Sequence, residues 1–543
     1  MANFFKLFIL SFLFITQASY GAVGSTVVWE IRTGGSSNNG GGFDTAKAGS
    51  DYSQQNSAQY NFTDLASTNA TTTCVVTSAS HNFVTADEGN IIHITAGTNW
   101  TAGFYEINST SGNAATLDRA CGTSASVSGG TYFVGGAYKL GASSDPTYFS
   151  QAVAGNKWWI KNDGTEHSST QNNSPTVGTA TALNLFQGYQ TTRGDNPTGS
   201  NRPTINQNSA NLVIGYTKLA NLIIRGSAAN MFQAGNGSQI VNSKVLNQAS
   251  IAGPGRNAIN CTSNCILNGV EAVSYNGNAI NLASGTMANI NGSFLHDSNV
   301  CLNLAAGTST IFSLTNSILA GCQAQAVNIT SAVTNPSFII GNTIYGFETP
   351  IASSSGVKVI TGSSEVSILN NILYGWATGI TNPDTNSGNY NDYNNFNNNT
   401  ADMSASWPKG SNSYAVAPNF KSVAAIRGTT ATTSGQVLTD SGANFSTVTD
   451  NQDHVYVSAS TGGNTGAWLI TGHTTTTLTV DSAIGALGTG SSVTYQVRTG
   501  QNWAPGPNMK WKAYPAAFTG SNTTSYLDLG GAQRHEYGKA VGR

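Results

Sequence analysis

Charged side chains are scarce in this chain, which has 23 Lys and Arg and 25 Asp and Glu among 543 residues. They make up 9% of the sequence, whereas an average globular protein has about 25%. The net charge of −2 offers no basic surface for nucleic acid and no strong acidic field. We therefore expect no nucleic-acid partner, and the uncharged polar surface suits hydrogen bonding to sugars.

Long apolar runs and helical patterns are also missing. The run Leu7–Ile15 is too short to span a bilayer, and with Lys6 before it and Ser19–Ala22 after it, it reads as an export signal. No segment shows the 3.6-residue apolar spacing of a long helix, and no heptads occur. We expect a secreted protein without a membrane span. A homotrimer would have to form through sheet faces or end modules, because no coiled coil is available.

Cysteine is rare, but its number is even. Six cysteines in an exported chain favour disulfides over metal sites. The predicted pairs are Cys74 with Cys121, Cys261 with Cys265, and Cys301 with Cys322. No CxxC motif occurs and the seven histidines are scattered, so we expect no zinc site and no other cofactor. Calcium lacks support as well, since Asp384 and Asp392 lie in a loop without spaced ligands.

What the sequence does contain is a repeat. Asparagine recurs at intervals of 21 to 29 residues, at Asn221, Asn242, Asn268, Asn291, Asn316, Asn342 and Asn371. Such a period, with short apolar strands and no helix, is typical of a β-solenoid. Parallel coils stack about 4.8 Å apart, so equivalent residues lie over one another. We interpret these asparagines as turn formers and as a ladder of amide hydrogen bonds along the axis.

Two segments outside the repeat resemble each other. The segments Thr73–Cys121 and Gln436–Asp481 share the same order of a strand, an Asn-Phe loop, a second strand, a Gly-rich turn and two further strands. One small β module is therefore used twice. Because the terminal coils of a solenoid expose core and strand edges, these modules either cap the solenoid or serve attachment or ligand binding.

The repeat between about Trp158 and Phe420 resembles the right-handed parallel β-helix superfamily of pectate-lyase-like proteins and phage tailspikes. The phrases VWEIRTGG, FQGYQTTRGD, AVAPNFKSV and YLDLGGAQR resemble text in β-helix proteins of phage and environmental bacteria. The resemblance implies an all-β fold, a right-handed parallel β-helix flanked by two similar small β modules. The expected division is a signal peptide (1–22), an N-terminal β module (23–140), the β-helix (141–425), a second β module (426–500) and a closing segment (501–543).

Enzymes that this chain resembles use carboxylates with a basic residue, or Asp and Glu pairs, to cleave polysaccharides. No paired Asp on adjacent coils and no cluster of three carboxylates occurs in the repeat. The candidate catalytic residues are Glu271, His296, Asp297 and Arg256, which could converge within one or two coils. Strand alternation puts Glu271 and Asp297 on one face only if a turn intervenes. The alternative is that these are solvated surface charges.

Aromatic residues give a second candidate site. Tyr345 and Tyr374 lie at the same offset from Asn342 and Asn371, so their rings should stack. Outward rings would form a platform for sugar faces, whereas inward rings would belong to the core. The candidate carbohydrate-binding residues are Tyr345, Tyr374, Trp376, Tyr390 and Tyr393.

Two functions remain open from the sequence. The first is a secreted or virion-surface β-helix that binds extracellular polysaccharide and could cleave it as a lyase or glycoside hydrolase. The second is a non-catalytic structural or adhesive solenoid of a cell surface or phage appendage. The missing carboxylate cluster and the doubled module favour the second, while the uncharged surface and the aromatic pair favour the first.

Overall fold

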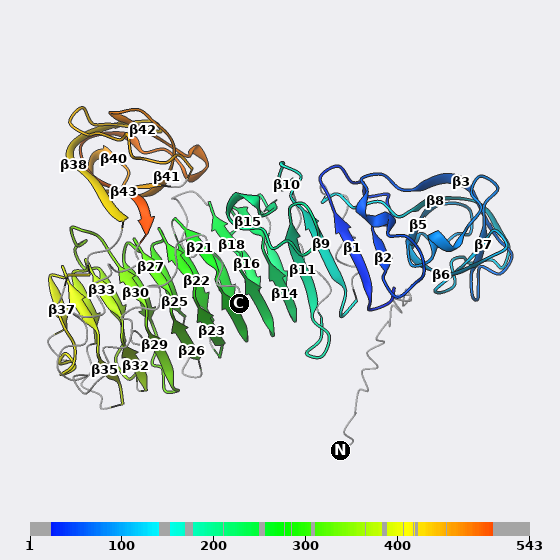
Figure 1. Ribbon diagram of the computed structural model, residues 1–543. Coiled ribbons are helices and arrows are strands. Elements are labelled where there is room, and N and C mark those ends of the chain that lie inside the picture. The colour runs from blue at the N-terminus through cyan, green and yellow to red at the C-terminus, as the bar shows by residue number, and fades with distance from the viewer. Residues whose placement is uncertain are drawn as a thin grey trace, which may run out of the picture.

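A computed structural model describes residues 23–502, apart from 141–152, 169–177, 210, 249–255, 276, 284, 306–309, 364, 383–387, 405–406, 416, 419–421 and 452 (Figure 1). The expected signal peptide lies outside the described residues, as does nearly all of the expected closing segment. Within the described residues, no helix has the length and apolar character needed to cross a bilayer.

The repeat forms a parallel β-solenoid, as expected, and its strands are arranged in three long sheets. Sheet 1 has the order β2 (Gly42–Asp44), β1 (Val27–Ile31), β9 (Lys157–Lys161), β11 (Asn184–Tyr189), β14 (Thr217–Ala220), β17 (Ser238–Val241), β20 (Cys265–Asn268), β23 (Met287–Asn291), β26 (Ile311–Thr315), β29 (Ser337–Ile340), β32 (Val366–Leu369) and β35 (Tyr390–Asp392). Its strands are parallel except for the β1–β2 pair. Both β1 and β2 come from the segment 23–140, which therefore contributes two strands to the solenoid as well as the first barrel.

The other two sheets repeat the same one-coil spacing. Sheet 2 has the order β10 (His167–Ser168), β12 (Thr204–Asn206), β15 (Ile223–Gly226), β18 (Lys244–Asn247), β21 (Glu271–Ser274), β24 (Phe294–His296), β27 (Ile318–Ala320), β30 (Thr343–Tyr345), β33 (Ile372–Tyr374) and β36 (Asn395–Asn397). Sheet 3 has the order β13 (Leu212–Ile214), β16 (Asn230–Ala234), β19 (Asn257–Cys261), β22 (Asn278–Leu282), β25 (Val300–Leu304), β28 (Gln325–Ile329), β31 (Ser355–Lys358), β34 (Thr378–Thr381) and β37 (Ala401–Met403).

One continuous apolar core runs inside the solenoid. In the first coils it is an aromatic stack, with ring centroids 5.1 Å apart for Trp29 and Trp158 and 5.6 Å apart for Trp158 and Phe186. Further along it is mostly aliphatic, with single aromatic residues such as Phe312 and Trp376. Every second residue of each strand points inward. The apolar residues of the repeat are thus explained by burial between the three sheets.

The corner between sheets 1 and 2 explains the recurring asparagines. One residue of each coil has a positive φ there, for example Asn221 (56°), Asn316 (52°) and Gly341 (69°). Glycine and asparagine tolerate this left-handed conformation best. The single ladder expected from the sequence is wrong in register. Asn221, Asn242 and Asn316 occupy the corner, Asn268 and Asn291 precede it by one residue, and Asn342 and Asn371 follow it by one.

The two modules are closed barrels of six strands with the same topology. The first barrel has the order β3 (Tyr60–Ser67), β4 (Val75–Thr77), β7 (Ala114–Leu117), β6 (Gly103–Ser111), β5 (Ile91–Ala96) and β8 (Val127–Val134). The second has the order β38 (Ser422–Ser434), β39 (Val437–Thr439), β42 (Thr477–Val480), β41 (Gly466–His473), β40 (His454–Gly463) and β43 (Gly488–Asn502). The predicted similarity of the modules is confirmed.

The barrels occupy different positions on the solenoid. Figure 1 shows the first barrel at the N-terminal end and the second barrel beside the solenoid, on the side of sheet 2. The core of the second barrel includes Leu246, Val273 and Tyr275 from strands β18 and β21 and the residue after β21. This barrel therefore covers part of the outer face of sheet 2.

All three predicted disulfides are present. Their Cα atoms are 5.8 Å apart in Cys74–Cys121, 6.3 Å in Cys261–Cys265 and 5.6 Å in Cys301–Cys322. The first closes the first barrel, and the other two lie in the solenoid.

Candidate functional site

Three of the four predicted catalytic residues meet on the outer face of sheet 2. Strands β21 and β24 pair in parallel, with Glu271 opposite Phe294 and Val273 opposite His296. The side chains of Ala272 and Leu295 point into the core, so Glu271 and His296 point outward. Asp297 follows β24 with φ 47°, and this turn brings it to the same face despite its opposite parity.

Side-chain contacts join these three residues. His296 Nε2 lies 3.2 Å from Oε1 of Glu271, and its Nδ1 lies 2.7 Å from Oδ2 of Asp297. Phe294 stacks on the imidazole with the ring centroids 3.9 Å apart. The ring of His296 is thus held in one orientation between two carboxylates.

Two cations neutralise Glu271. Lys244 Nζ lies 2.7 Å from its Oε1, and Arg202 Nη2 lies 3.8 Å from its Oε2. Burial opposes ionisation of this carboxyl, but Lys244 and His296 outweigh burial and hold its pKa well below the usual value. Glu271 is therefore ionised at neutral pH.

The second barrel adds a histidine that sequence reasoning missed. His454, the first residue of β40, places Nδ1 3.1 Å from Oδ2 of Asp297 and Nε2 3.0 Å from the hydroxyl of Tyr275. Burial, together with the neighbouring His296 and Lys244, holds the pKa of His454 well below its usual value. His454 is 157 positions after Asp297, and no local motif links the two residues.

This histidine cluster, comprising Glu271, His296, Asp297 and His454, is closed to large ligands. The exposed fractions are 9% for Glu271, 2% for His296, 1% for Asp297 and 4% for His454. The fourth predicted residue, Arg256, donates from Nη1 to the carbonyl of Ser227, and no contact among the described residues joins its guanidinium to the cluster. A polysaccharide could reach the two carboxylates only if the second barrel moved.

The predicted aromatic group is divided by the fold. Tyr345 and Tyr374 stack with their centroids 5.2 Å apart, and their hydroxyls donate to Oε1 and Oε2 of Glu348 at 2.8 and 2.7 Å. Tyr345 is buried, Tyr374 is half-buried, and Trp376 lies in the core. Arg427 of the second barrel contacts Glu348 at 3.2 Å, so this pair lies beside the docked barrel.

Tyr390 leads to a surface that sequence reasoning missed. It lies on the outer face of sheet 1, and Tyr393 occupies the corner after it with φ 56°. In the strand register Tyr390 is opposite Ser367, which is opposite Phe338, which in turn is opposite Ser313. The row continues through Asn289 to Ile266. We call this row of six outward residues the sheet 1 row.

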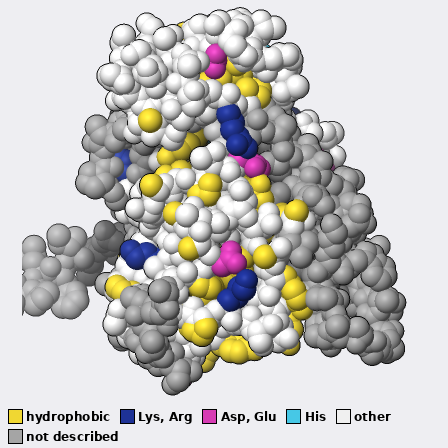
Figure 2. Space-filling view, turned by 90° about the vertical axis from the view of Figure 1, so that its left-hand side faces the viewer, with side chains coloured by type: hydrophobic (Ala, Val, Ile, Leu, Met, Phe, Trp, Pro, Cys, Tyr) yellow, Lys and Arg dark blue, Asp and Glu magenta, His cyan; other side chains and the backbone are white. Residues whose placement is uncertain are grey.

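A signal for the sheet 1 row is present in the sequence. Each member lies three residues before the corner residue with positive φ, as Phe338 does before Gly341 and Tyr390 before Tyr393. An alignment on the corner, instead of on asparagine, would have superposed Phe338 and Tyr390. Figure 2, which views the C-terminal end of the solenoid, shows hydrophobic side chains scattered among uncharged ones and few charged side chains.

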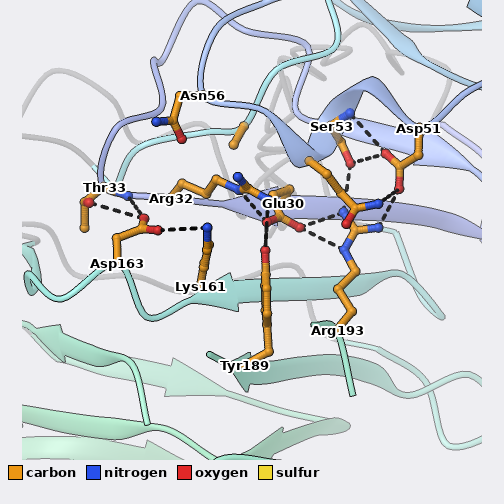
Figure 3. Close-up of polar contacts among 12 residues, drawn as sticks. Glu30, Arg32, Thr33, Asp51, Ser53, Asn56, Lys161, Asp163, Tyr189 and Arg193 are labelled. Carbon is orange, nitrogen blue, oxygen red and sulfur yellow. Dashed lines mark hydrogen bonds and ion pairs between the residues drawn. The ribbon is translucent and has the colours of Figure 1, made fainter. Parts of the chain in front are cut away.

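A second buried charge network joins the first coils to the first barrel (Figure 3). The buried carboxylate of Glu30 on β1 accepts from Nε of Arg32 at 2.7 Å, from Nε and Nη2 of Arg193 at 2.9 and 2.6 Å, and from the Tyr189 hydroxyl. Arg193 also donates to Asp51 at 2.6 Å and to Ser53 at 2.9 Å. Asp51 and Ser53 belong to the segment around the 3-10 helix η1 (Tyr52–Gln54) that leads into the first barrel. The contacts of this network are internal, which indicates a structural junction.

Comparisons with known proteins give structural neighbours only. No family model and no curated protein sequence matches the chain. A double mutant of the tailspike of E. coli bacteriophage HK620, in complex with a pentasaccharide, aligns at 10% identity and TM-score 0.31 over 64% of this chain and 86% of the tailspike. The PL6 family alginate lyase AlyGC aligns at 11% identity and TM-score 0.28, covering 50% of this chain and 53% of the lyase.

A third structure is the Gp54 tailspike of Acinetobacter baumannii bacteriophage AP22, in complex with A. baumannii capsular saccharide. It aligns at 12% identity and TM-score 0.20 over 81% of this chain and 83% of the tailspike. At these values the fold assignment rests on the strand pairing described above. No functional residue is carried over from these proteins.

Proposed function

We propose that this protein is an extracellular β-helix that binds polysaccharide along the outer face of sheet 1. The observation that carries the proposal is the sheet 1 row, in which apolar Ile266, Phe338 and Tyr390 are 46%, 39% and 52% exposed. Asn289, Ser313 and Ser367 lie between them in register. The row thus combines apolar surface with amide and hydroxyl groups, and none of its six members is charged.

The regular coil spacing suits a polymeric ligand. Neighbouring members are one coil apart, about 4.8 Å, so Phe338 and Tyr390 repeat an aromatic ring after two coils. Aromatic side chains combine an apolar ring with low conformational freedom, and neutral amides and hydroxyls both donate and accept hydrogen bonds. These are the groups that a neutral sugar chain would need along its length.

The geometry favours binding over cleavage. The carboxylates of Glu271 and Asp297 lie on sheet 2, under the second barrel, and not on the sheet 1 row. Cleavage would require a carboxylate pair that a glycosidic bond can reach. Three disulfides are consistent with an extracellular location.

Retention of the purified chain on a panel of immobilised bacterial and algal polysaccharides tests the proposal. For a retained polysaccharide, we expect Phe338→Ala and Tyr390→Ala to weaken binding at least tenfold, which corresponds to about 1.4 kcal/mol. Val84→Ala is the matched control, because it removes a 47% exposed apolar side chain from the vicinity of the first barrel. This variant should bind like the unmodified protein.

Two other results would contradict the proposal. Failure to bind across a broad panel would favour the structural or adhesive solenoid. Release of reducing or unsaturated ends that Glu271→Ala or Asp297→Ala abolishes would instead establish a cleaving enzyme whose site opens beneath the second barrel.

A further inference from the structure

We propose that His296, Asp297 and His454 bind one zinc ion at the junction between the solenoid and the second barrel. Each residue offers one ligand atom, and these atoms lie within 4.8 Å of one another. Oδ2 of Asp297 is common to both short contacts, 2.7 Å from Nδ1 of His296 and 3.1 Å from Nδ1 of His454. Two imidazoles and a carboxylate are ligands that zinc prefers in proteins.

The spacing of these atoms is close to that of a metal site. Ligands at 2.0–2.2 Å from a tetrahedral zinc ion lie roughly 3.3 Å from one another. The two histidine–aspartate contacts, 2.7 and 3.1 Å, are shorter than this separation by at most about 0.6 Å, and the two histidine nitrogens lie within 4.8 Å of each other. Small side-chain rotations would therefore admit the ion, and water would supply the fourth ligand.

The surrounding hydrogen bonds orient both imidazoles for this role. The Nε2 atom of His296 lies 3.2 Å from Glu271, so a zinc ion bound at Nδ1 would leave the imidazole hydrogen on Nε2, where Glu271 can accept it. Nε2 of His454 faces the Tyr275 hydroxyl, which can accept in the same way. In a neutral imidazole with hydrogen on Nε2, the lone pair is on Nδ1. Both lone pairs then point at Asp297, and partners on the outer nitrogen are the usual support of metal-binding histidines.

One buried nitrogen of the cluster lacks a hydrogen bond within the described part of the chain. Nδ1 of His454 is buried and has no hydrogen-bond partner among the described residues, since its 3.1 Å contact with Asp297 counts as an ion pair and not as a hydrogen bond. A buried polar atom without a partner costs about 1–3 kcal/mol. A zinc ion at this position would satisfy it and neutralise Asp297.

The ion would also join two parts of the chain. His296 is the last residue of β24 in the solenoid and Asp297 follows it, whereas His454 is the first residue of β40 in the second barrel. The free energy of zinc binding would then stabilise the docked position of the second barrel on sheet 2. The proposal is independent of glycan binding, since the sheet 1 row lies on a different face.

Metal analysis of the full mature chain without an affinity tag tests this inference. After removal of metal with a chelator, reloading with Zn²⁺ and gel filtration, we expect one zinc per chain. His454→Ala and Asp297→Asn should lose the zinc. His473→Ala, a control in the same barrel whose Nδ1 pairs with Asp450 at 2.8 Å, should keep it.

Two measurements protect the test against variants that fail to fold. Co²⁺ titration of the unmodified chain should give the visible absorption of a tetrahedral site, and Zn²⁺ should abolish it. Zn²⁺ should also raise the melting temperature of the unmodified chain and of His473→Ala, but not that of His454→Ala. The inference is overturned if the unmodified chain holds no stoichiometric metal, or if His454→Ala retains it. The cluster would then be a metal-free network of side-chain contacts in which His296 lies between Glu271 and Asp297.

Discussion

Asn342 donates from its side-chain amide to Oδ1 of Asn371, one coil further along, at 2.9 Å. The same oxygen accepts from the backbone N–H of Asn342 at 2.9 Å. Asn371 repeats both contacts with Asn394, at 3.1 and 2.9 Å. This buried ladder satisfies backbone groups that the corner between sheets 1 and 2 would leave unpaired.

Asn371→Ala should destabilise the solenoid. The substitution removes the acceptor of two buried donors of Asn342, and each unsatisfied group costs about 1–3 kcal/mol. We expect a lower midpoint of thermal and urea unfolding, followed by circular dichroism.

Asn281→Ala is the control for that experiment. Asn281 belongs to an outer ladder on sheet 3, where it donates to Asn260 at 2.8 Å and accepts from Asn303 at 2.8 Å, and it is half-exposed. Water can replace these partners, so the midpoint should change little. Equal losses in both variants would show that burial of the ladder is not what makes it stabilising.

The buried carboxylate of Glu30 should make Arg193 necessary for stability. Arg193→Met removes one of its two guanidinium partners and also the link to Asp51. Breaking a buried ion pair costs about 3–5 kcal/mol when the remaining charge is uncompensated, and Arg32 should reduce that cost here. We expect a clear fall in the unfolding midpoint.

A double-mutant cycle separates the charge effect from lost packing. Glu30→Gln removes the stranded charge, so the variant with both Glu30→Gln and Arg193→Met should be more stable than Arg193→Met alone. If the two substitutions are additive instead, the ion pair does not contribute and the loss comes from packing.

Glu106 should make the stability of the protein depend on pH. Burial, assisted by the neighbouring Asp44, raises the pKa of Glu106 to about 7, from an ordinary value of 4.5. Between these values the folded chain holds a proton that the unfolded chain has lost, so stability falls as pH rises from about 4.5 to 7. The fall attributable to this group should be about 1–3 kcal/mol.

Glu106→Gln should flatten this dependence, because the amide mimics the protonated acid and can still accept from the Gly24 N–H. Asp453, whose pKa is raised to about 6, acts in the same direction and remains in the variant. The control is Glu365→Gln at an exposed position, whose melting temperature should follow the unmodified protein from pH 4 to 8. An unchanged slope in Glu106→Gln would contradict the assignment.

Much of the fold was predictable because solenoid order is local in sequence. The 21- to 29-residue period and the absence of helical patterns predicted the parallel coils, and the matching order of strands predicted two similar β modules, which the structure shows to be barrels. The register within each coil was not predictable from asparagine alone. Asparagine and glycine both fit the left-handed corner. In two coils Gly269 and Gly292 occupy the corner, and the asparagine that belongs to the sequence repeat lies one residue before it.

The candidate sites were less predictable, since they depend on how the second barrel docks. Sequence spacing brought Glu271, His296 and Asp297 to one face, and the φ of Asp297 supplied the turn that this convergence required. Tyr345 on sheet 2 is buried, whereas Tyr390 on sheet 1 is exposed. Strand alternation shows which residues share a face, but it does not show which face is covered by another part of the protein.

The sequence by itself determined the coil and the similarity of the two β modules, because repeat spacing and strand patterns act over short distances, and it predicted the three cysteine pairs that the structure contains. Only the tertiary structure decided that His454 lies against Asp297 and that the second barrel packs on Val273 of sheet 2 and on Tyr275 in the turn after it. The scattered histidines predicted no metal site, and two of them meet only because apolar side chains of sheet 2 and the second barrel share one core. Contacts of this kind join residues more than 150 positions apart, and the sequence repeat does not predict them.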